Sequence, residues 1–567
     1  MRLLNVAIWV GLVTVSGCGR ADGDQSAPTT APASNAGVQS APAESQWYPL
    51  KPYATQDSGA PASTPPPPQG VDLGAAAVDS SPHNTESYDS LEESRFLTVG
   101  ESPLSTFSID VDTASYANVR RFLNSGSLPR VGAVRIEELI NYFPYQYTPP
   151  LGNDPFAVNA EVAACPWKPE HQLVRIGLKG RVVDHAERPP CQLVFLIDVS
   201  GSMESQNKLP LVKRSLSALV ASLDAHDRIA IVTYAGSTRV ALPSTSAREK
   251  HTLITAMESL GSGGSTNGAG GIQLAYRTAR ENFIKEGVNR VVLCTDGDFN
   301  VGTTDASSLV QLIEKEAQTG VSLSVLGFGM GNYQDDRMEK LADHGDGNYA
   351  YIDTYAEARK VLVEQLTGTL ITIAKDVKIQ VEFNPAEVQA YRLLGYENRV
   401  LAAQDFRNDQ KDAGEVGAGH TVTALYEVVP QGVDFTAPEI ASSKYQKPAQ
   451  TTKAAQTGEL MNVRIRSQPP TGGEATEREF PIAKLDQRFE RASKDFQFAA
   501  SVAAFGLLLR NSPHKGLSTW DAVTEWATPA VSADPEGYRR EFLTLVQKAQ
   551  QIQLHISQRQ DPLQAGR

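Results

Sequence analysis

Short apolar segments alternate with amphipathic segments between residues 190 and 370. The apolar segments have the length of buried strands and cover 192–197, 228–233, 290–295, 322–327 and 348–352. Helical periodicity indicates helices over 209–223, 247–260, 270–284, 309–317, 335–343 and 356–367. Strands that are apolar on both faces need cover on both faces. This order therefore predicts an α/β fold with a doubly wound, mainly parallel sheet.

The chain on either side of this region has a different pattern. Apolar and polar residues alternate as in half-buried strands over 156–163, 172–178, 377–383 and parts of 388–394, 422–429 and 460–465. We therefore expect a mixed α/β region over 94–185 and a β-rich, sandwich-like region over 373–475. Phe498, Val502 and Phe505 recur at helical spacing, so we expect C-terminal helices over 476–567.

The two flanking regions suggest one common structure. Strands just before residue 186 and just after residue 373 could pair with each other in one β-sandwich. The α/β domain over 186–372 would then be an insertion between them. This hypothesis predicts that strands near 158–179 share a sheet with strands near 377–429.

The N-terminus has the features of an export signal. Met1 and Arg2 precede an apolar run that is too short to span a membrane, and the run ends in Val15-Ser16-Gly17-Cys18. This ending resembles the lipobox of bacterial lipoproteins, which implies a signal peptide over 1–17 and a lipid on Cys18. An ordinary signal peptide is the alternative.

The segment that follows indicates where the protein acts. Residues 18–93 are rich in Ala, Pro, Ser, Thr, Gln and Gly, a composition that predicts a disordered tether. The residue after Cys18 is Gly19 rather than Asp, and the resemblance to proteobacterial lipoproteins then implies sorting to the outer membrane. We therefore expect a protein of the bacterial cell envelope, anchored by lipid to the outer membrane and facing the periplasm.

Charge and cysteine content exclude several partners. The net charge of −13 disfavours nucleic acid and anionic lipid, so membrane contact is expected only through the lipid anchor.

No Cys/His cluster has the spacing of a zinc site. If Asp198 and Asp296 lie level on adjacent strands, Cys191 and Cys294 are offset by five residues, too far for a disulfide. A bridge between Cys165 and Cys191 remains possible.

Oxygen-bearing side chains follow two of the expected buried strands. Asp198, Ser200 and Ser202 come directly after the first apolar run, and Asp296 follows the run over 290–295. Between them, a glycine-rich loop presents Thr266. Carboxylate and hydroxyl oxygens are hard ligands of the kind that Mg²⁺ and Ca²⁺ bind. The sequence therefore contains the parts of a divalent-ion site.

This order of motifs closely resembles the von Willebrand factor type A domain, a Rossmann-like fold, over 186–372. The resemblance implies the strand order 3-2-1-4-5-6 and a metal-ion-dependent adhesion site at the carboxyl ends of the first and fourth strands. It also implies that Ser200, Ser202 and Thr266 bind the ion directly, and that Asp198 and Asp296 bind it directly or through water. Mg²⁺ is the expected ion, with Mn²⁺ or Ca²⁺ as alternatives.

The ligand set favours capture of a partner over catalysis. Three of the five expected ligands are neutral hydroxyls, so the ion keeps much of its charge and favours an acidic residue of a protein partner. No nucleophile, base or phosphate loop of recognisable spacing accompanies the site, so we expect no enzyme and no organic cofactor. The alternatives are a metal-assisted hydrolase and an envelope scaffold that binds through its flanking regions.

The flanking regions carry a second resemblance. Segments 103–116, 391–399 and 412–420 are similar to segments that flank the A domain in a bacterial family of exported proteins. Related pairings of an A domain with a sandwich occur in integrin β subunits and inter-alpha-trypsin heavy chains. This resemblance covers about 94–550 and implies an architecture rather than a partner.

Some short motifs resemble other kinds of site. Ser205 and Lys208 have the SxxK spacing of penicillin-binding proteins, but no SDN or KTG motif follows, so we interpret the segment as the approach to a helix. The glycines of 327–331 form GxGxG rather than a dinucleotide fingerprint and predict a turn. Asp110 and Asp112 could cap the next helix or form a second ion site.

Overall fold

The computed structural model describes residues 86, 88, 91–184, 187–264, 268–297, 306–330, 334–436 and 451–560. The expected signal peptide, Cys18, nearly all of the tether and Thr266 lie outside these residues. In the part that is described, none of the helices combines the length and the apolar character needed to cross a membrane.

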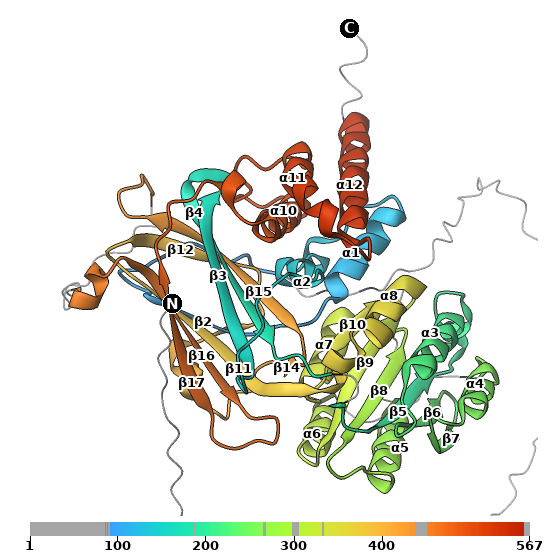
Figure 1. The fold of residues 1–567 in the computed structure, drawn as a ribbon. Coiled ribbons are helices and arrows are strands. Elements are labelled where there is room, and N and C mark those ends of the chain that lie inside the picture. The colour runs from blue at the N-terminus through green and yellow to red at the C-terminus, as the bar shows by residue number, and fades with distance from the viewer. Residues whose placement is uncertain are drawn as a thin grey trace, which may run out of the picture. The chain divides into compact units, whose positions relative to one another are not determined.

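The central region is a six-stranded sheet in the order β10-β9-β8-β5-β6-β7 (Figure 1). Its strands are β5 (Cys191–Asp198), β6 (Arg228–Tyr234), β7 (Thr238–Ser246), β8 (Val288–Thr295), β9 (Val321–Phe328) and β10 (Tyr349–Ile352). All neighbouring pairs are parallel except β6 with β7. The doubly wound α/β fold and the implied strand order are confirmed.

Helices cover both faces of this sheet (Figure 1). They are α3 (Leu209–Ser222), α4 (Lys250–Glu258), α5 (Gly268–Glu281), α6 (Ala306–Ala317), α7 (Asp335–Asp343), α8 (Tyr355–Arg359) and α9 (Leu366–Leu370). Phe195 of β5 packs toward α3 and α4, whereas Val194 and Leu196 pack toward α5 and α7. Successive residues of a strand point to opposite faces, and this alternation explains why the strands are apolar throughout.

Two antiparallel sheets form the expected sandwich. One contains β1 (Leu97–Thr98), β12 (Val388–Leu394), β15 (Thr421–Pro430), β4 (Lys168–Gly180) and β3 (Phe156–Cys165) in that order. The other contains β13 (Val400–Leu401), β2 (Leu104–Ser108), β11 (Thr372–Phe383), β16 (Glu459–Gln468) and β17 (Thr476–Ala483), with β14 (Val416–Gly417) paired to β11. Apolar side chains of both sheets share one core.

The pairing of β4 with β15 joins the regions before and after the α/β domain. The register places Lys179 opposite Thr421, so strands far apart in sequence share a sheet. The hypothesis of an inserted α/β domain is therefore confirmed. The expected change at residue 475 does not coincide with a structural boundary, because β17 begins at Thr476 and pairs with β16.

The remaining helices share a core of their own. They are α1 (Ala114–Asn124), α2 (Ile136–Asn141), α10 (Lys494–Leu509), α11 (Trp520–Ala527) and α12 (Tyr538–Gln560). Short turns complete the fold: η1 (Val131–Ala133), η3 (Gly201–Glu204), η4 (Lys360–Glu364), η5 (Ala403–Arg407), η6 (Lys453–Gln456), η7 (Phe489–Arg491) and η8 (Thr528–Ala533). Phe498, Val502 and Phe505 of the expected helical stripe are buried in this core.

Cys165, Cys191 and Cys294 are buried free thiols, so the bridge between Cys165 and Cys191 does not form. Cys191 lies opposite Val288 on β8, and Cys294 lies opposite Ile197 on β5. The two sulfurs are therefore six residues apart along the strands rather than five. Burial raises the pKa of all three thiols above the usual range.

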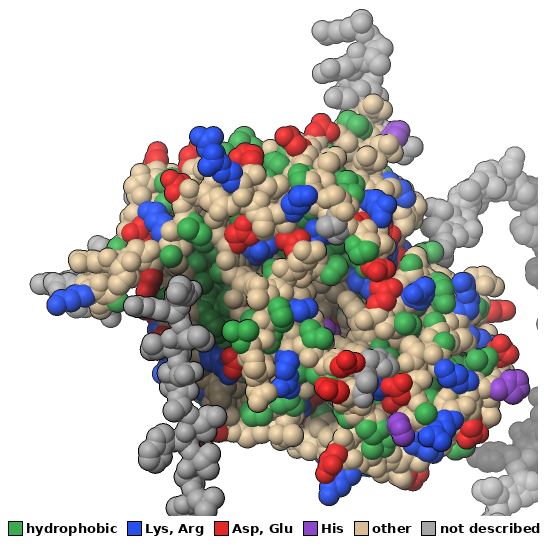
Figure 2. Space-filling model, in the orientation of Figure 1, with side chains coloured by type: hydrophobic (Ala, Val, Ile, Leu, Met, Phe, Trp, Pro, Cys, Tyr) green, Lys and Arg blue, Asp and Glu red, His purple; other side chains and the backbone are tan. Residues whose placement is uncertain are grey.

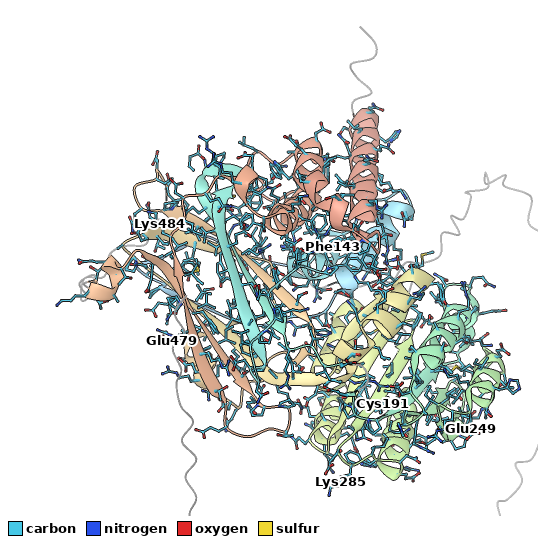
Figure 3. All side chains as sticks on the ribbon, viewed as in Figure 1. Phe143, Cys191, Glu249, Lys285, Glu479 and Lys484 are labelled. Atoms are coloured by element: carbon cyan, nitrogen blue, oxygen red, sulfur yellow. The ribbon has the colours of Figure 1, made fainter. Side chains whose placement is uncertain are left out.

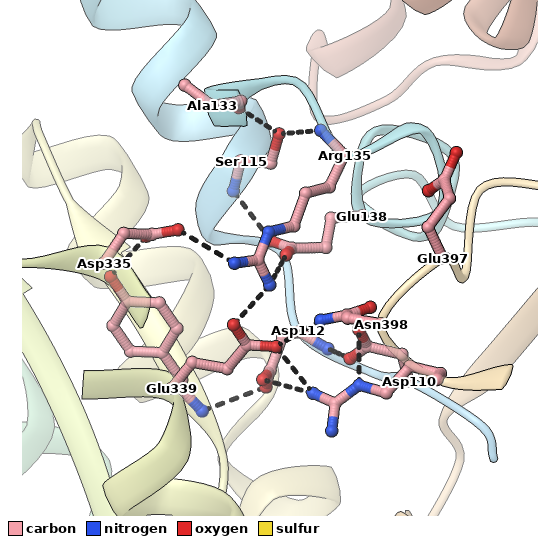
Figure 4. Close-up of polar contacts among 12 residues, drawn as sticks. Asp110, Asp112, Ser115, Ala133, Arg135, Glu138, Asp335, Glu339, Glu397 and Asn398 are labelled. Atoms are coloured by element: carbon pink, nitrogen blue, oxygen red, sulfur yellow. Dashed lines mark hydrogen bonds and ion pairs between the residues drawn. The ribbon is translucent and has the colours of Figure 1, made fainter. Parts of the chain in front are cut away.

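Asp110 and Asp112 lie where the sandwich meets the α/β domain. Asp112 Oδ1 accepts a hydrogen bond from the backbone N–H of Tyr349 at 2.9 Å, and Asp110 pairs with Arg399 at 3.3 Å. The helix α1 that follows has no side-chain cap at Thr113. The two aspartates thus serve as ion-pair partners at this junction, and neither caps the helix (Figure 4).

Candidate metal-ion site

Two expected ligands lie at the carboxyl ends of neighbouring parallel strands. Asp198 is the last residue of β5, and Asp296 directly follows β8. The register pairs Ile197 with Cys294, so the two strands end nearly level. Both aspartates have 0% of their surface exposed. This position is the topological switch point, where open α/β sheets bind their ligands.

The turn after β5 places two hydroxyls beside Asp198. The backbone N–H of Ser200 donates to Asp198 Oδ1 at 2.8 Å, which fixes the carboxylate relative to the turn. The hydroxyl oxygens of Ser200 and Ser202 are 3.0 Å apart. Two oxygens at this separation, next to a carboxylate, can share one cation.

The glycine-rich loop is tied to the same turn. Gly201 N–H donates to the carbonyl of Gly264 at 3.2 Å, and Gly263 N–H donates to the carbonyl of Val199 at 2.7 Å. Gly264 has a φ of +89°, a conformation that favours glycine. The structure therefore brings Asp198, Ser200, Ser202 and Asp296 to one end of the sheet. Thr266, two residues after Gly264, lies outside the described residues, and its role as a ligand stays a prediction.

One carboxylate oxygen at this site lacks a partner. Oδ2 of Asp198 is buried and accepts no hydrogen bond of normal geometry from the described residues. Burial raises the pKa of Asp198 to about 6, while hydrogen bonds from Ser200 and, more weakly, Tyr234 oppose the rise. A buried carboxylate oxygen without a partner is costly. A bound cation would remove this cost, so the residues present fit a hard divalent ion.

The donor set depends on its hydroxyls. Among the described residues, no group of three or more His, Cys, Asp or Glu side chains could hold a metal ion. Two carboxylates and two or more hydroxyls suit Mg²⁺, which accepts few protein ligands and keeps bound water.

Lys208 also reaches this site, and the sequence reasoning missed it. Its ammonium donates to Asp296 Oδ2 at 2.7 Å, although only 7% of the residue is exposed. The stem of Lys208 passes over Gly329, where an added Cβ would lie 2.3 Å from the lysine Cε. Both residues come from motifs interpreted above as a helix approach and a turn. Lys208 follows β5, and Gly329 follows β9, which is a neighbour of β8 in the sheet. The predicted strand order could therefore have indicated that the two residues lie close together.

The structure also contains a cavity away from the proposed ligands. It has a volume of about 600 Å³, and Lys360, His420 and Tyr538 are among its lining residues. None of Asp198, Ser200, Ser202 and Asp296 lines it. The candidate ion site is therefore separate from this cavity.

Comparison with known proteins supports the central domain and its flanks. The family model described as von Willebrand factor type A domain matches residues 192–365, and one described as von Willebrand factor matches 82–175. A third, described as Uncharacterized protein YfbK, C-terminal, matches residues 368–552. Together these models cover the sandwich, the α/β domain and most of the C-terminal helices.

Individual relatives span different parts of the chain. The inter-alpha-trypsin inhibitor heavy chain H3 of Homo sapiens is 26% identical over 193 residues, which are 32% of this chain and 22% of that protein. A solved von Willebrand factor type A structure from Catenulispora acidiphila is 15% identical, covers 69% of this chain and 88% of its own, and has a TM-score of 0.38.

A bacterial protein matches most of the chain. The protein named Uncharacterized protein YfbK, from Escherichia coli (strain K12), is 44% identical over 472 residues, which are 82% of this chain and 81% of that protein. The match includes the flanking regions as well as the α/β domain. The chain therefore belongs to the YfbK family of proteins with a von Willebrand factor type A domain.

Proposed function

We propose that this protein captures an acidic residue of a protein partner through a divalent ion. Its von Willebrand factor type A domain is of a kind that binds proteins or mediates adhesion. Asp198, Ser200, Ser202, Thr266 and Asp296 would hold the ion, most favourably Mg²⁺. The observation that carries the proposal is the buried Oδ2 of Asp198, which accepts no normal hydrogen bond from the described residues.

The chain's own residues define how such an ion would be held. Ser200 N–H orients Asp198 through its hydrogen bond to Oδ1, while Oδ2 accepts no normal hydrogen bond from the described residues. The Ser200 and Ser202 hydroxyls supply neutral oxygens, so they add no negative charge. When bound, Mg²⁺ would supply a Lewis-acidic position open to a partner's carboxylate. The buried carboxylates and the open position together favour recognition of an acidic side chain.

The distribution of surface charge supports recognition by a specific site. Figure 2 shows acidic and basic side chains interspersed over the visible face, without an extended patch of one sign. Such a face offers little long-range attraction to a uniformly charged partner. The proposed ion site would then provide the selectivity for a carboxylate.

A metal-assisted hydrolase is the alternative. In the described part of the site, the Ser200 and Ser202 hydroxyls contact each other, and the Lys208 ammonium pairs with Asp296. Neither arrangement presents a nucleophile to a general base. The geometry therefore favours binding over hydrolysis.

Calorimetric titration tests the ion site. The full chain, stripped with EDTA, is titrated with Mg²⁺ beside Asp198→Ala and Glu249→Gln, an exposed acid of the same domain (Figure 3). We expect saturable binding by the wild type and by Glu249→Gln, and none by Asp198→Ala. Equal heats from all three proteins would contradict the ion site.

Capture from envelope extract tests the partner. We expect a protein retained in Mg²⁺ and released by EDTA, and the same protein absent with Asp198→Ala. If EDTA and the substitution both leave retention unchanged, the result would instead support a scaffold that binds through its flanking regions.

We further propose that the protein is a lipoprotein of the bacterial outer membrane. The lipobox-like ending at Cys18 and the composition of the tether support this location. We expect Cys18→Ser to move the protein from the membrane fraction to the soluble fraction. Unchanged fractionation would contradict lipid anchoring.

A further inference from the structure

We infer that the ammonium of Lys208 forms a permanent part of the proposed ion site. Its positive charge weakens binding of the divalent ion and strengthens capture of the partner's carboxylate. The inference rests on the proposed function and deepens it. In this view, Lys208 sets the balance between the affinity of the site for the metal ion and the positive charge that remains for the partner's carboxylate.

The contact between Lys208 and Asp296 is buried. Lys208 is 7% exposed and Asp296 is 0% exposed, and the ammonium lies 2.7 Å from Asp296 Oδ2. An ion pair in such surroundings is weakly screened by water and salt. Removing either partner would leave an uncompensated buried charge. The pair is therefore expected to persist in the absence of a divalent ion.

The structure provides a specific path for the lysine stem. Gly329 has a φ of +77° and lacks the Cβ that would meet Lys208 Cε, Cγ and Cδ within 3 Å. The carbonyl of Gly329 accepts a hydrogen bond from the Tyr351 hydroxyl, which holds this turn against β10. The stem thus packs in a fixed position, and the ammonium is directed to Asp296 rather than to solvent.

Asp198 and Asp296 differ in what the chain offers them. Asp296 has an ammonium at hydrogen-bond distance, whereas Asp198 Oδ2 accepts no normal hydrogen bond from the described residues. Within this pair, the ion would therefore be attracted mainly by Asp198.

The charge balance gives the functional consequence. Two carboxylates neutralise a divalent ion, but with the Lys208 ammonium the assembled site keeps one positive charge. The ammonium repels the divalent ion, so it lowers the affinity for metal. The same positive charge attracts an incoming carboxylate. Lys208 therefore favours a site whose ion is completed by the partner over a site that holds its ion firmly by itself.

Substitution of Lys208 tests the two effects, which have opposite signs. Mg²⁺ is titrated into the EDTA-stripped full chain and into Lys208→Met, which removes the charge but keeps the length of the stem. We expect Lys208→Met to bind Mg²⁺ at least tenfold more tightly than the wild type. Lys285→Met removes an exposed lysine of the same domain (Figure 3), and we expect it to leave the affinity unchanged.

A second measurement reports on carboxylate capture. Mn²⁺ replaces Mg²⁺ at saturating concentration, and acetate serves as the probe, because Mn²⁺ broadens the NMR signal of an acetate that binds it. We expect acetate to bind Lys208→Met several-fold more weakly than the wild type. Lys208→Arg keeps the positive charge, so we expect its affinities for the metal and for acetate to be closer to those of the wild type than to those of Lys208→Met.

The outcomes separate this inference from the proposed function. If the wild type does not bind Mg²⁺, both fail. If the wild type binds Mg²⁺ but Lys208→Met binds it equally or more weakly, only the role of Lys208 fails. Circular dichroism verifies the fold of each variant, and Lys208→Gln takes the place of Lys208→Met in the same comparison if the methionine variant is unfolded.

Discussion

Two sets of buried carboxylates in this protein have different surroundings. At the junction of helix α2 with α7 of the α/β domain, Arg135 lies among Glu138, Asp335 and Glu339 (Figure 4). At the end of β5, Asp198 has no arginine or lysine as an ion-pair partner among the described residues, and its Oδ2 accepts no normal hydrogen bond from them. At this junction the chain supplies a cation to the carboxylates, whereas no described arginine or lysine pairs with Asp198. Burial of a carboxylate alone therefore does not indicate function. At Asp198 the indication comes from the missing ion-pair partner together with the adjacent hydroxyls at the end of β5.

The largest expected effect is the loss of Arg135. The residue is 3% exposed, so Arg135→Met leaves buried Glu138 and Asp335 without this cation and leaves Glu339 with Arg399 alone. We expect a loss of roughly 3–5 kcal/mol in the free energy of unfolding. Urea unfolding measures it, and unchanged Mg²⁺ affinity in the surviving folded fraction would show that the two regions are independent. Wild-type stability in this variant would contradict the structural role of the junction.

Glu137 sharpens the comparison, because it is a buried carboxylate with neither oxygen hydrogen-bonded within the described structure. Burial raises the pKa of Glu137 to about 7, with Glu397 adding to the rise and Arg510 opposing it. The native state therefore binds this proton more tightly than the unfolded state. Stability is fully present below the unfolded pKa of about 4.3 and is lost as pH rises through 7.

Glu137→Gln should remove this pH dependence. Between pH 4 and pH 8, we expect the variant to gain about 3 kcal/mol of stability relative to the wild type. Thermal unfolding of both proteins across this range measures the difference. A constant difference at all pH values would mean that Glu137 does not titrate as its burial implies.

At the ion site, the expected effect is ligand-dependent stability. Mg²⁺ at about 100 times its dissociation constant should stabilise the wild type by about 2.7 kcal/mol, because the ion binds only the folded state. Asp198→Asn should abolish this gain, while Glu249→Gln should keep it. Thermal unfolding with Mg²⁺ or EDTA measures the shift. A Mg²⁺ shift that persists in Asp198→Asn would place the bound ion elsewhere.

The smallest expected effect is at an exposed ion pair. Arg407 contacts Glu477 at 2.9 Å, but 70% of the arginine side chain is exposed. Arg407→Met should therefore leave the free energy of unfolding nearly unchanged, because water and salt screen an exposed ion pair. This variant is the matched control for Arg135→Met, and a comparable loss from both would contradict the importance of burial.

Local patterns predicted much of the fold and part of the site. The helix over 335–343 has the predicted boundaries. By contrast, β7 was not predicted, because its partly exposed residues lack a continuous apolar run. The helix expected over 356–367 is divided into α8, the π-helical turn η4 and α9, and Lys360 at the start of that turn packs on Tyr142. This division depends on a contact that local periodicity does not report.

The sequence by itself determined the alternation of strands and helices, and with it the position of Asp198 and Asp296 at strand ends. Apolar periodicity acts over a few residues, so it survives in the linear order of the chain. Only the tertiary structure decided which charges meet. Lys208 reaches Asp296 across the glycine at 329, and Arg135 meets Asp335 and Glu339, because strand order and packing bring together residues that are distant in sequence. Whether a buried carboxylate has a counter-ion is therefore a property of the folded chain.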